Sequence, residues 1–318
     1  MIPYEWLDQA CDRIAPFIHR TPLTYDPQND LYLKCENHQI TGSFKARGAI
    51  NKVLSLQEWE LDKGLVTASA GNHGQGVALA GRIKQTSVKV YVSEHAQPNK
   101  IQSMRDLGAE IIFVPGGYAE AESAGISYAK SSGATWISPY NDGLVIAGQG
   151  TIGLEILTDL PDPSSTTWLI PAGGGGLVAG IGSALSALNP RPKLVAVQSE
   201  ASSFLHSIYH HGTQEGVVEG PSLADGLAGP VESGSVTIPM MMGYVDDFIL
   251  VSENDIRKAI KYAWIEYHEC IEGSAAVSLA AVFSGSVTTR PLIVVLTGGN
   301  IDPIDHELIV KDNSLESF

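Results

Sequence analysis

The sequence is poor in cysteine and has neither a long apolar run nor a leader-like beginning. Its three cysteines, Cys11, Cys35 and Cys270, are scattered and form no Cys-x-x-Cys pair. This pattern excludes a disulfide-stapled secreted fold and favours reduced thiols in a cytoplasmic protein. No stretch of about 18 uninterrupted apolar residues exists, so we expect no membrane span. The beginning, MIPYEWLDQACDRIAPF, lacks the basic region and apolar run of a signal peptide.

Basic residues are also scarce. The 318 residues include 20 Lys and Arg against 35 Asp and Glu, which gives a formal net charge of −15. Such a charge repels phosphate backbones and anionic headgroups, so we expect no nucleic-acid partner and no membrane partner. With 44% hydrophobic and 17% charged residues, the chain can build a large core, and general disorder is excluded. The length suggests two domains or one large one.

What the sequence does contain is an alternation of short apolar runs and helix-like segments. Several runs are rich in Val and Ile with little polar alternation, as in parallel strands that are covered on both faces. The pattern predicts an α/β fold with open, mostly parallel sheets flanked by helices. Helices are expected at 46–54 and at 255–269, the second after a capping Ser252. The expected strands are 31–36, 65–69, 89–93, 110–115, 135–139, 168–171, 193–198, 248–252 and 292–297.

The first candidate site is the segment TGSFKARG at 41–48. A hydroxyl of Thr41 or Ser43 is expected to cap the following helix, which places Lys45 in its first turn. The positive end of the helix dipole disfavours a further positive charge there and so lowers the pKa of the amine. A neutral amine is what Schiff-base chemistry with an aldehyde requires. Taken alone, however, such a lysine is more often a surface residue of an amphipathic helix.

A second polar turn, SAGNHGQG at 69–76, follows a predicted strand and precedes an apolar helix. Its small residues expose consecutive backbone N–H groups to an anion such as a carboxylate. The amide of Asn72 can reach a ring hydroxyl from this position. An ordinary helix-entry turn explains the same residues equally well.

The strongest indication of a phosphate ligand is a run of four glycines at 173–176, between a predicted strand and a predicted helix. Without Cβ atoms, the backbone can wrap closely around a phosphate at a helix N-terminus. The pattern Gly174-x-Gly176-x-x-Ala179 also matches a dinucleotide-binding fingerprint. A nicotinamide-dependent oxidoreductase is therefore an alternative.

Two further features could bind ligands. Thr297 ends a buried strand before Gly-Gly-Asn, and its hydroxyl can bond a ring nitrogen, although strand propensity alone explains it. His206 and His210 are spaced i, i+4, but no third ligand with convincing spacing accompanies them. We therefore predict no metal site at these histidines.

Taken together and in this order, the motifs resemble the β-family of pyridoxal 5′-phosphate (PLP) enzymes, also called fold type II. The most similar branch contains the serine/threonine dehydratases (ammonia-lyases) and serine racemases, and the resemblance runs from about residue 21 to residue 302. Cysteine synthases of this fold carry a threonine-rich loop in place of NHGQ, so sulfhydrylation is disfavoured. The motifs are GSFKARGA at 42–49, AGNHGQ at 70–75, AGQGT at 147–151, GGGG at 173–176 and GGN at 298–300.

The resemblance implies a role for each candidate residue. Lys45 would be the Schiff-base lysine and the base that removes the α-proton of the substrate. Around the cofactor, Phe44 would pack against the ring, Asn72 would bond the ring hydroxyl and Thr297 would face the pyridine nitrogen. The phosphate would lie on Gly173, Gly174, Gly175 and Gly176. The substrate carboxylate would lie on Ser69, Ala70, Gly71, Asn72 and His73.

The same resemblance implies a domain organisation and an activity. A large PLP-binding domain would comprise 1–63 and 142–318, and a small domain at 64–141 would close over the substrate. The enzyme would be a lyase that converts a β-hydroxy amino acid (L-threonine, L-serine or a 3-hydroxy analogue) into a 2-oxo acid and ammonia. Serine racemase-type activity and a catalytically silent PLP-binding relative are the alternatives. We also expect a homodimer.

Two positions depart from the family pattern. Racemases of this branch have a serine at the position of Ala70, where it serves as acid and base on the ring face opposite the lysine. An alanine cannot move a proton. Many relatives also bind a divalent cation through two acidic residues, where our alignment places Gln198 and Phe204, with Glu200 as the nearest acid. We therefore expect elimination without racemisation and no bound metal.

Overall fold

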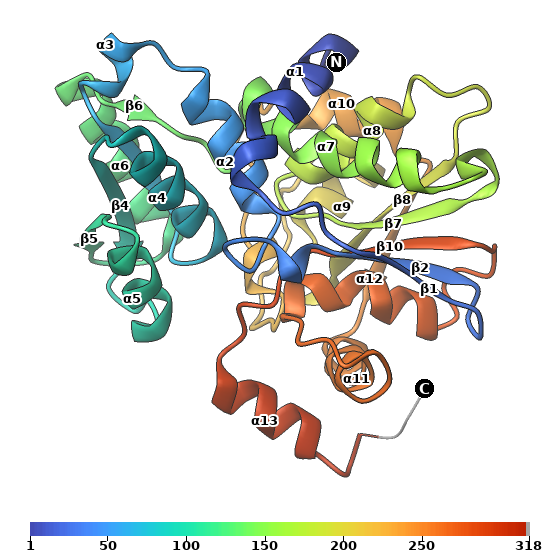
Figure 1. Cartoon of the computed structure of the whole chain (residues 1–318). Helices are drawn as coiled ribbons and strands as arrows, with labels where there is room; N and C mark the ends of the chain where they lie inside the picture. Colours follow the sequence, from blue (N-terminus) through green and yellow to red (C-terminus); the bar gives the residue numbers. More distant parts are fainter. Residues whose placement is uncertain (316–318) are drawn as a thin grey trace.

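The fold is built on two separate sheets. A computed structural model describes residues 1–315, and its strands are β1 (Leu23–Asp26), β2 (Leu31–Cys35), β3 (Leu65–Ala68), β4 (Val88–Ser93), β5 (Glu110–Val114), β6 (Thr135–Trp136), β7 (Thr167–Pro171), β8 (Lys193–Ser199), β9 (Asp247–Val251) and β10 (Leu292–Leu296). The large sheet has six strands in the order β1-β2-β10-β7-β8-β9, and the small sheet has four in the order β5-β4-β3-β6. All paired strands run parallel except β1 and β2 (Figure 1).

Helices connect most of these strands. Within residues 1–315, none of them combines the length and the apolarity that crossing a membrane requires. Short 3-10 turns are η1 (Ala15–Phe17), η2 (Glu36–His38), η3 (Pro163–Ser165), η4 (Glu200–Ser202) and η5 (Asp225–Leu227), and η6 (Ala263–Tyr267) is a π-helix. The α-helices are α1 (Tyr4–Ile14), α2 (Lys45–Leu54), α3 (Glu58–Leu61), α4 (Asn72–Lys84), α5 (Pro98–Asp106), α6 (Tyr118–Ser132), α7 (Gly143–Asp159), α8 (Gly176–Leu185), α9 (Phe204–His211), α10 (Thr237–Tyr244), α11 (Glu253–Tyr262), α12 (Gly273–Phe283) and α13 (Pro303–Lys311).

The α/β class is confirmed, and each strand expected from the sequence is present. The additional strand, β1, is not predictable from its own residues, because its LTYD sequence is partly exposed and has no apolar run. Ser252 caps α11 as expected, since its Oγ accepts the N–H of Asp255 at 3.2 Å. The helix expected at 255–269 is found as α11 followed by the π-helical turn η6.

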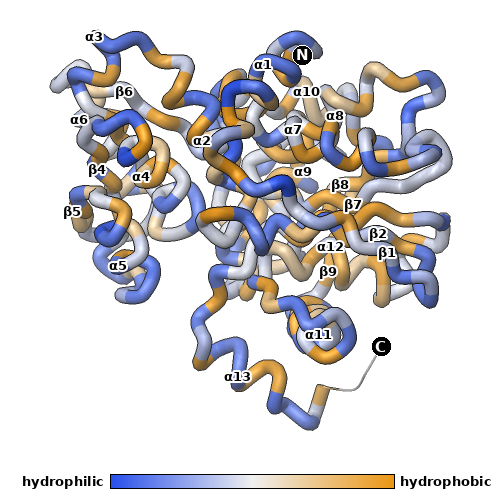
Figure 2. Tube along the Cα trace, in the orientation of Figure 1, coloured by the Kyte–Doolittle hydropathy of each residue, from blue (hydrophilic) through white to orange (hydrophobic). Residues whose placement is uncertain are grey.

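The large sheet is covered on both faces, which explains the continuous apolar runs of its strands. Every residue of β7 and of β10 is buried. Helices α7, α8 and α10 pack on one face, and α11 and α12 pack on the other (Figure 1). Figure 2 shows the apolar residues gathered along these strands between the two helical layers. Burial of each large apolar side chain contributes about 1.5–3 kcal/mol, so these two layers contribute strongly to the stability.

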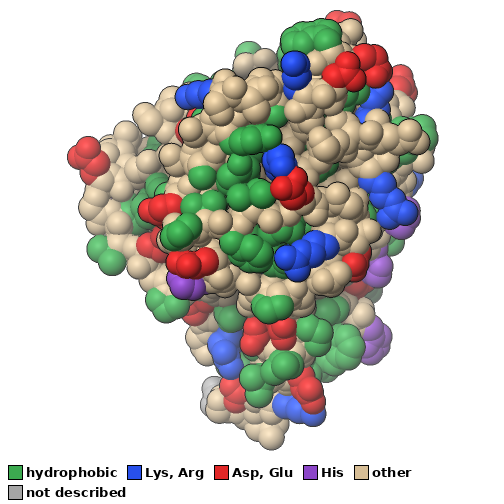
Figure 3. Space-filling view, turned by 90° about the vertical axis from the view of Figure 1, so that its left-hand side faces the viewer, with side chains coloured by type: hydrophobic (Ala, Val, Ile, Leu, Met, Phe, Trp, Pro, Cys, Tyr) green, Lys and Arg blue, Asp and Glu red, His purple; other side chains and the backbone are tan. Residues whose placement is uncertain are grey.

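The small sheet is formed by one continuous part of the chain, from β3 to β6. Helices α4 and α5 contribute to the core on one of its faces, and α6 packs on the other. Strand β5 lies at the edge, where Phe113 is 49% exposed. Figure 3 views the molecule from this side and shows apolar side chains interspersed with acidic and basic ones.

Helix α2 joins the two sheets. It packs against α4 of the small-sheet unit and against α7 of the large-sheet unit. Its buried residues Ala46, Ala49, Ile50 and Val53 belong to the same apolar core as α4. The first residue of α2 therefore lies at the junction between the two units, close to the carboxyl ends of their strands, where open α/β sheets bind ligands.

Candidate active site

Lys45 is the first residue of α2, as the sequence predicts, but the predicted cap is wrong. Phe44, not Thr41 or Ser43, stands at the N-cap, with helical φ and ψ of −58° and −20° and no side-chain cap. Its backbone N–H donates to the carbonyl of Thr297 at 3.1 Å. The hydroxyls of Thr41 and Ser43 have no hydrogen-bond partner within residues 1–315. A backbone contact with the residue after β10 therefore starts the helix in place of a capping hydroxyl.

The side chain of Lys45 is half-buried and its amine has protein partners. Its Nζ donates to the carbonyl of Pro139 at 3.1 Å and lies 5.2 Å from the centre of the Phe44 ring. Burial lowers the pKa of this amine to about 8, and the carboxylate of Glu272 opposes the shift. At neutral pH the neutral fraction of Lys45 is therefore far larger than that of an ordinary lysine. A neutral amine is the form that acts as nucleophile or base.

Glu272 is a functional candidate that the sequence interpretation missed. The residue directly precedes α12, is 7% exposed and accepts a hydrogen bond from Asn72 Nδ2 at 2.6 Å. Burial raises the pKa of its carboxyl to about 7, with Asp225 adding to the rise and Lys100 opposing it. The available signal was a glutamate directly before the apolar segment GSAAVSLAAV, because buried carboxylates are rare without partners.

The turn after β3 leads into α4, whose first residue is Asn72. Ser69 Oγ accepts the N–H of Gly71 at 3.2 Å, and Ala70 packs against the core of the small sheet. The first N–H groups of a helix have no partner inside it, so this turn is suited to a carboxylate.

His73 is buried in the first turn of α4. Its Nε2 lies 3.1 Å from the carbonyl of Ile137 and must therefore donate a proton to it. Burial lowers the pKa of His73 to about 3, with Lys45 as the second cause. The imidazole stays neutral, and its unprotonated Nδ1 has no partner within the described residues.

The run of four glycines connects β7 to α8, as predicted. A Cβ on Gly174 would lie 2.4 Å from the ring of Tyr140, and one on Gly173 would lie 2.9 Å from the Cα of Leu227. Gly175 has a φ of +84°, which side chains disfavour. The loop therefore has no side chains, and Tyr140 and Leu227 pack closely against its backbone. Tyr140 was not a predicted contact, because its position depends on how the chain returns from the small sheet.

The structure brings the predicted residues together although they are far apart in the sequence. Asn72 follows β3, the glycine run follows β7, and the buried Thr297 follows β10. Lys45 reaches the backbone after β6 through Pro139. Carboxyl ends of strands from both sheets thus surround one site that contains an amine of lowered pKa, a buried carboxyl and a glycine loop without Cβ atoms.

The residues considered as metal ligands do not form a comparable site. In the part of the chain that the structure describes, no three His, Cys, Asp or Glu side chains are grouped to hold an ion. The rings of His206 and His210 lie 4.3 Å apart on α9. Gln198 Oε1 accepts the backbone N–H of His206 at 3.1 Å, and Phe204 is buried.

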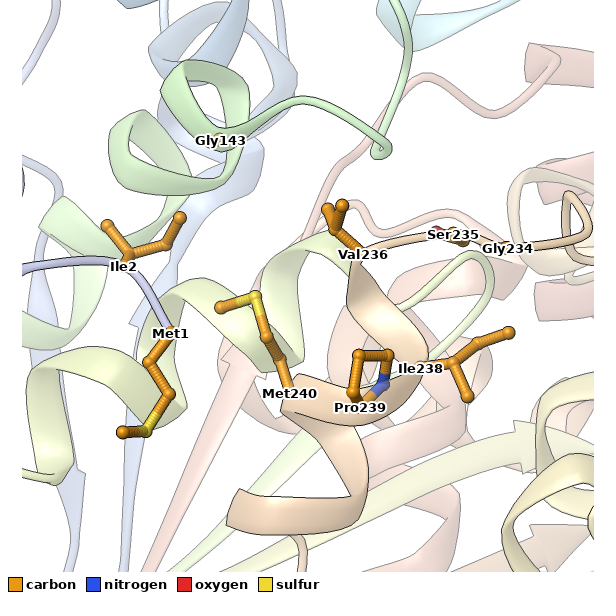
Figure 4. A pocket seen from close by; sticks show the side chains of 9 residues that line it. All are labelled: Met1, Ile2, Gly143, Gly234, Ser235, Val236, Ile238, Pro239 and Met240. Atoms are coloured by element: carbon orange, nitrogen blue, oxygen red, sulfur yellow. The ribbon is translucent and has the colours of Figure 1, made fainter.

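An apolar hollow of about 740 Å³ lies at another place, between the N-terminus and α10 (Figure 4). Among the described residues that line it, Ser235 carries the one polar side chain, so the hollow offers no acid or base. Its lining residues are Met1, Ile2, Gly143, Gly234, Ser235, Val236, Ile238, Pro239 and Met240.

Comparison with known proteins decides the chemistry. The family described as "Pyridoxal-phosphate dependent enzyme" matches residues 14–298. The chain belongs to this family. The PLP-dependent enzyme is also similar to the L-threonine ammonia-lyase of Thermotoga maritima, with 40% identity over 324 residues that cover 100% of this chain and 80% of that protein. These matches confirm a PLP-dependent lyase and decide against the nicotinamide alternative.

Solved structures confirm the fold of the enzyme. The processed form of threonine deaminase isoform 2 from Solanum lycopersicum has 29% identity and a TM-score of 0.89, with 99% of this chain and 93% of that chain covered. Maize serine racemase has 30% identity and a TM-score of 0.87, with 95% and 94% covered. Both are enzymes of the branch that the motifs resemble.

The residues at the site fit PLP. An amine with a lowered pKa suits an aldehyde. The four glycines carry no Cβ, so the loop can present bare backbone to a phosphate, while Tyr140 and Leu227 pack where Cβ atoms would otherwise lie. The buried hydroxyls of Thr41 and Ser43, which stand just before Lys45 in the chain, lack partners within residues 1–315.

Proposed function

We propose that this lyase deaminates L-threonine or L-serine, yielding a 2-oxo acid and ammonia. The observation that carries the proposal is Lys45, a half-buried amine at the start of α2 whose pKa is lowered to about 8 and which feels the charge of the buried Glu272. The 40% identity to an L-threonine ammonia-lyase, along the whole chain, supports the same substrate class.

In this proposal the predicted residues keep the roles that the resemblance implies. PLP bound to Lys45 would supply an electron sink for bonds at the α-carbon of the amino acid. Phe44, Asn72 and Thr297 would hold its ring, and Gly173, Gly174, Gly175 and Gly176 would hold its phosphate. The turn of Ser69, Ala70, Gly71, Asn72 and His73 would bind the substrate carboxylate.

Lys45 would also remove the α-proton, because it is the base at the centre of the site. Its lowered pKa makes its neutral fraction larger than that of an ordinary lysine, and Glu272 is close enough to influence its charge. We further propose that residues 64–141 form a domain that closes over the substrate and excludes water. A homodimer is proposed as the working form, which sedimentation velocity tests.

The proposal is tested by a 2-oxo acid assay over L-threonine, L-serine and 3-hydroxyaspartate. We expect turnover of at least one of the first two and a visible absorption band that borohydride bleaches. The variant Lys45→Ala should lose both turnover and the borohydride-reducible attachment. Lys52→Ala, on the same helix, is the control and should keep both.

Peptide mapping after reduction locates the attachment. A pyridoxyl group on a lysine other than Lys45 would overturn the assignment of the whole site. Binding of PLP without release of oxo acid from any of these amino acids would favour the catalytically silent relative.

A further inference from the structure

The side-chain amide of Asn72 is held at both ends. Its Oδ1 accepts a hydrogen bond from Asn300 Nδ2 at 2.7 Å, and its Nδ2 donates to Glu272 Oε1 at 2.6 Å. Asn300 Nδ2 also donates to the carbonyl of Thr41 at 2.8 Å. The three side chains come from the start of α4, the loop after β10 and the residue before α12. A relay of hydrogen bonds therefore connects parts of the chain that are distant in sequence.

The direction of this relay is fixed by the chemistry of its first member. A backbone carbonyl accepts hydrogen bonds and cannot donate, so the amide atom of Asn300 that faces Thr41 must be nitrogen. The same nitrogen reaches Asn72, so the facing atom of Asn72 must be its oxygen. The nitrogen of Asn72 then faces Glu272, with one N–H bonded to the carboxylate and the second N–H still available.

We propose that Asn300 and Glu272 are positioning residues that orient the amide of Asn72, so that its second N–H points to the ring hydroxyl of the cofactor. This inference rests on the proposed function, in which Asn72 contacts that hydroxyl. A donor at this place stabilises the deprotonated hydroxyl and lowers its pKa. An inverted amide would present an oxygen to the same hydroxyl and would have the opposite effect.

Two glycines make room for the relay. Gly42 has a φ of +70°, and a Cβ there would lie 2.4 Å from Asn300 Oδ1. A Cβ on Gly298 would lie 2.6 Å from Glu272 Oε1. Both positioning residues thus occupy space that any other residue at positions 42 and 298 would restrict. The backbone N–H of Glu272 donates to the carbonyl of Gly298 at 3.0 Å, which ties the two loops together.

The test is a double-mutant cycle read by absorption of the PLP-loaded protein. In Asn300→Asp, an oxygen replaces the donor to Thr41 and Asn72, so the amide of Asn72 loses its fixed orientation. We expect the balance between the two absorption bands of bound PLP to titrate about one pH unit higher, which is a tenfold change in the equilibrium. Asn72→Ala should cause a similar shift. In the Asn72→Ala background, Asn300→Asp should add nothing, because Asn300 acts through Asn72.

The control is Asn254→Asp, the same chemical change at an exposed position of α11, which should leave the titration unchanged. Asn300→Ala gives a second variant if Asn300→Asp fails to fold. An unchanged titration in both, or a full additional shift in the Asn72→Ala background, overturns the inference. A wild-type protein without a visible PLP band overturns the proposed function as well, whereas a normal wild-type band with unresponsive variants overturns only the relay.

Discussion

The pair Lys45 and Glu272 sets the protonation of the site. Burial lowers the pKa of the lysine to about 8 and raises that of the glutamate to about 7, and each charge favours the charged form of the other. Between these two values the lysine is mostly protonated and the glutamate mostly ionised. Above about pH 8 the amine becomes neutral and reactive.

This pair predicts a pH shift. In cofactor-free protein, the rate at which PLP attaches should rise with pH through a midpoint near 8, because the neutral amine reacts. Glu272→Gln removes the negative charge that raises the pKa of Lys45, so the midpoint should move to lower pH. Stopped-flow absorbance measures the rate of PLP attachment at each pH and so gives the midpoint. Glu215→Gln removes the same charge from an exposed position and should not move the midpoint.

The alanine at position 70 leads to a second prediction, that the enzyme eliminates without racemising. Elimination needs one base, whereas racemisation needs a second group on the opposite face of the substrate, which an alanine cannot supply. The wild type should convert L-serine, if it is accepted, to pyruvate with little D-serine. Ala70→Ser should introduce measurable D-serine, since a hydroxyl adds little volume. Chiral chromatography of the residual serine measures D-serine formation. Equal rates of D-serine and pyruvate formation in the wild type would favour a racemase.

At the scale of elements, a buried ionic cluster fastens α2. Arg47 Nε donates to Glu36 at 2.8 Å, and its Nη1 donates to Glu155 at 2.7 Å. Lys34 Nζ lies 2.6 Å from the same Glu155. The side chains of Arg47, Glu36 and Lys34 are fully buried, and the cluster connects β2, the turn after it, α2 and α7.

Removing Arg47 should be strongly destabilising, because Glu36 would stay buried without its partner. We expect Arg47→Ala to lower the free energy of unfolding by about 3–5 kcal/mol. Arg20→Ala is the control, since its pair with Asp159 is exposed and such pairs contribute less than about 1 kcal/mol. Urea unfolding followed by circular dichroism gives both values. A loss below that of the control would show that the cluster does not fasten α2.

The same elements show what the sequence could and could not predict. The lysine, the glycine run and Asn72 were found because each lies in a short motif beside an apolar run. Glu272 escaped because its partner Asn72 is 200 residues away. The expected cap of α2 failed for a related reason, since Thr297 from the end of β10 satisfies the N–H of Phe44. Short sequence patterns do not predict contacts between residues that are hundreds of positions apart in the chain.

For the whole molecule, α5 forms a polar contact between the two sheet units. Lys100 Nζ lies 2.7 Å from Asp225, and Asn99 Nδ2 donates to Asp302 at 2.9 Å. We expect these bonds to hold the proposed small domain closed. Lys100→Ala should raise hydrogen exchange in residues 64–141 about two- to fivefold, which corresponds to up to about 1 kcal/mol for a partly exposed pair.

Lys89→Ala is the matched control, because its ion pair with Glu110 lies wholly within residues 64–141. Exchange that rises equally in both variants would indicate loosening within the small domain rather than opening between the units.

The whole enzyme should also be independent of divalent cations. Gln198 and Phe204 stand where relatives carry acidic ligands, and Gln198 is engaged by the backbone of His206. Magnesium or calcium should not raise the melting temperature, since an ion that binds the folded state would do so in proportion to its concentration. Loss of activity on chelation, restored by either ion, would contradict this and point to Glu200.

The pairing of β2 with β10 has a consequence for how the molecule is made. Leu31 lies opposite Leu292, so the ribosome must add roughly 260 residues before β2 receives this neighbour. At about 5–20 residues per second, that wait is on the order of 13–50 s. The small sheet draws all its strands from residues made in between, and it can form while the large sheet waits. The newborn chain therefore carries the apolar strand LYLKC with an open edge for many seconds, and in that interval it is most exposed to aggregation.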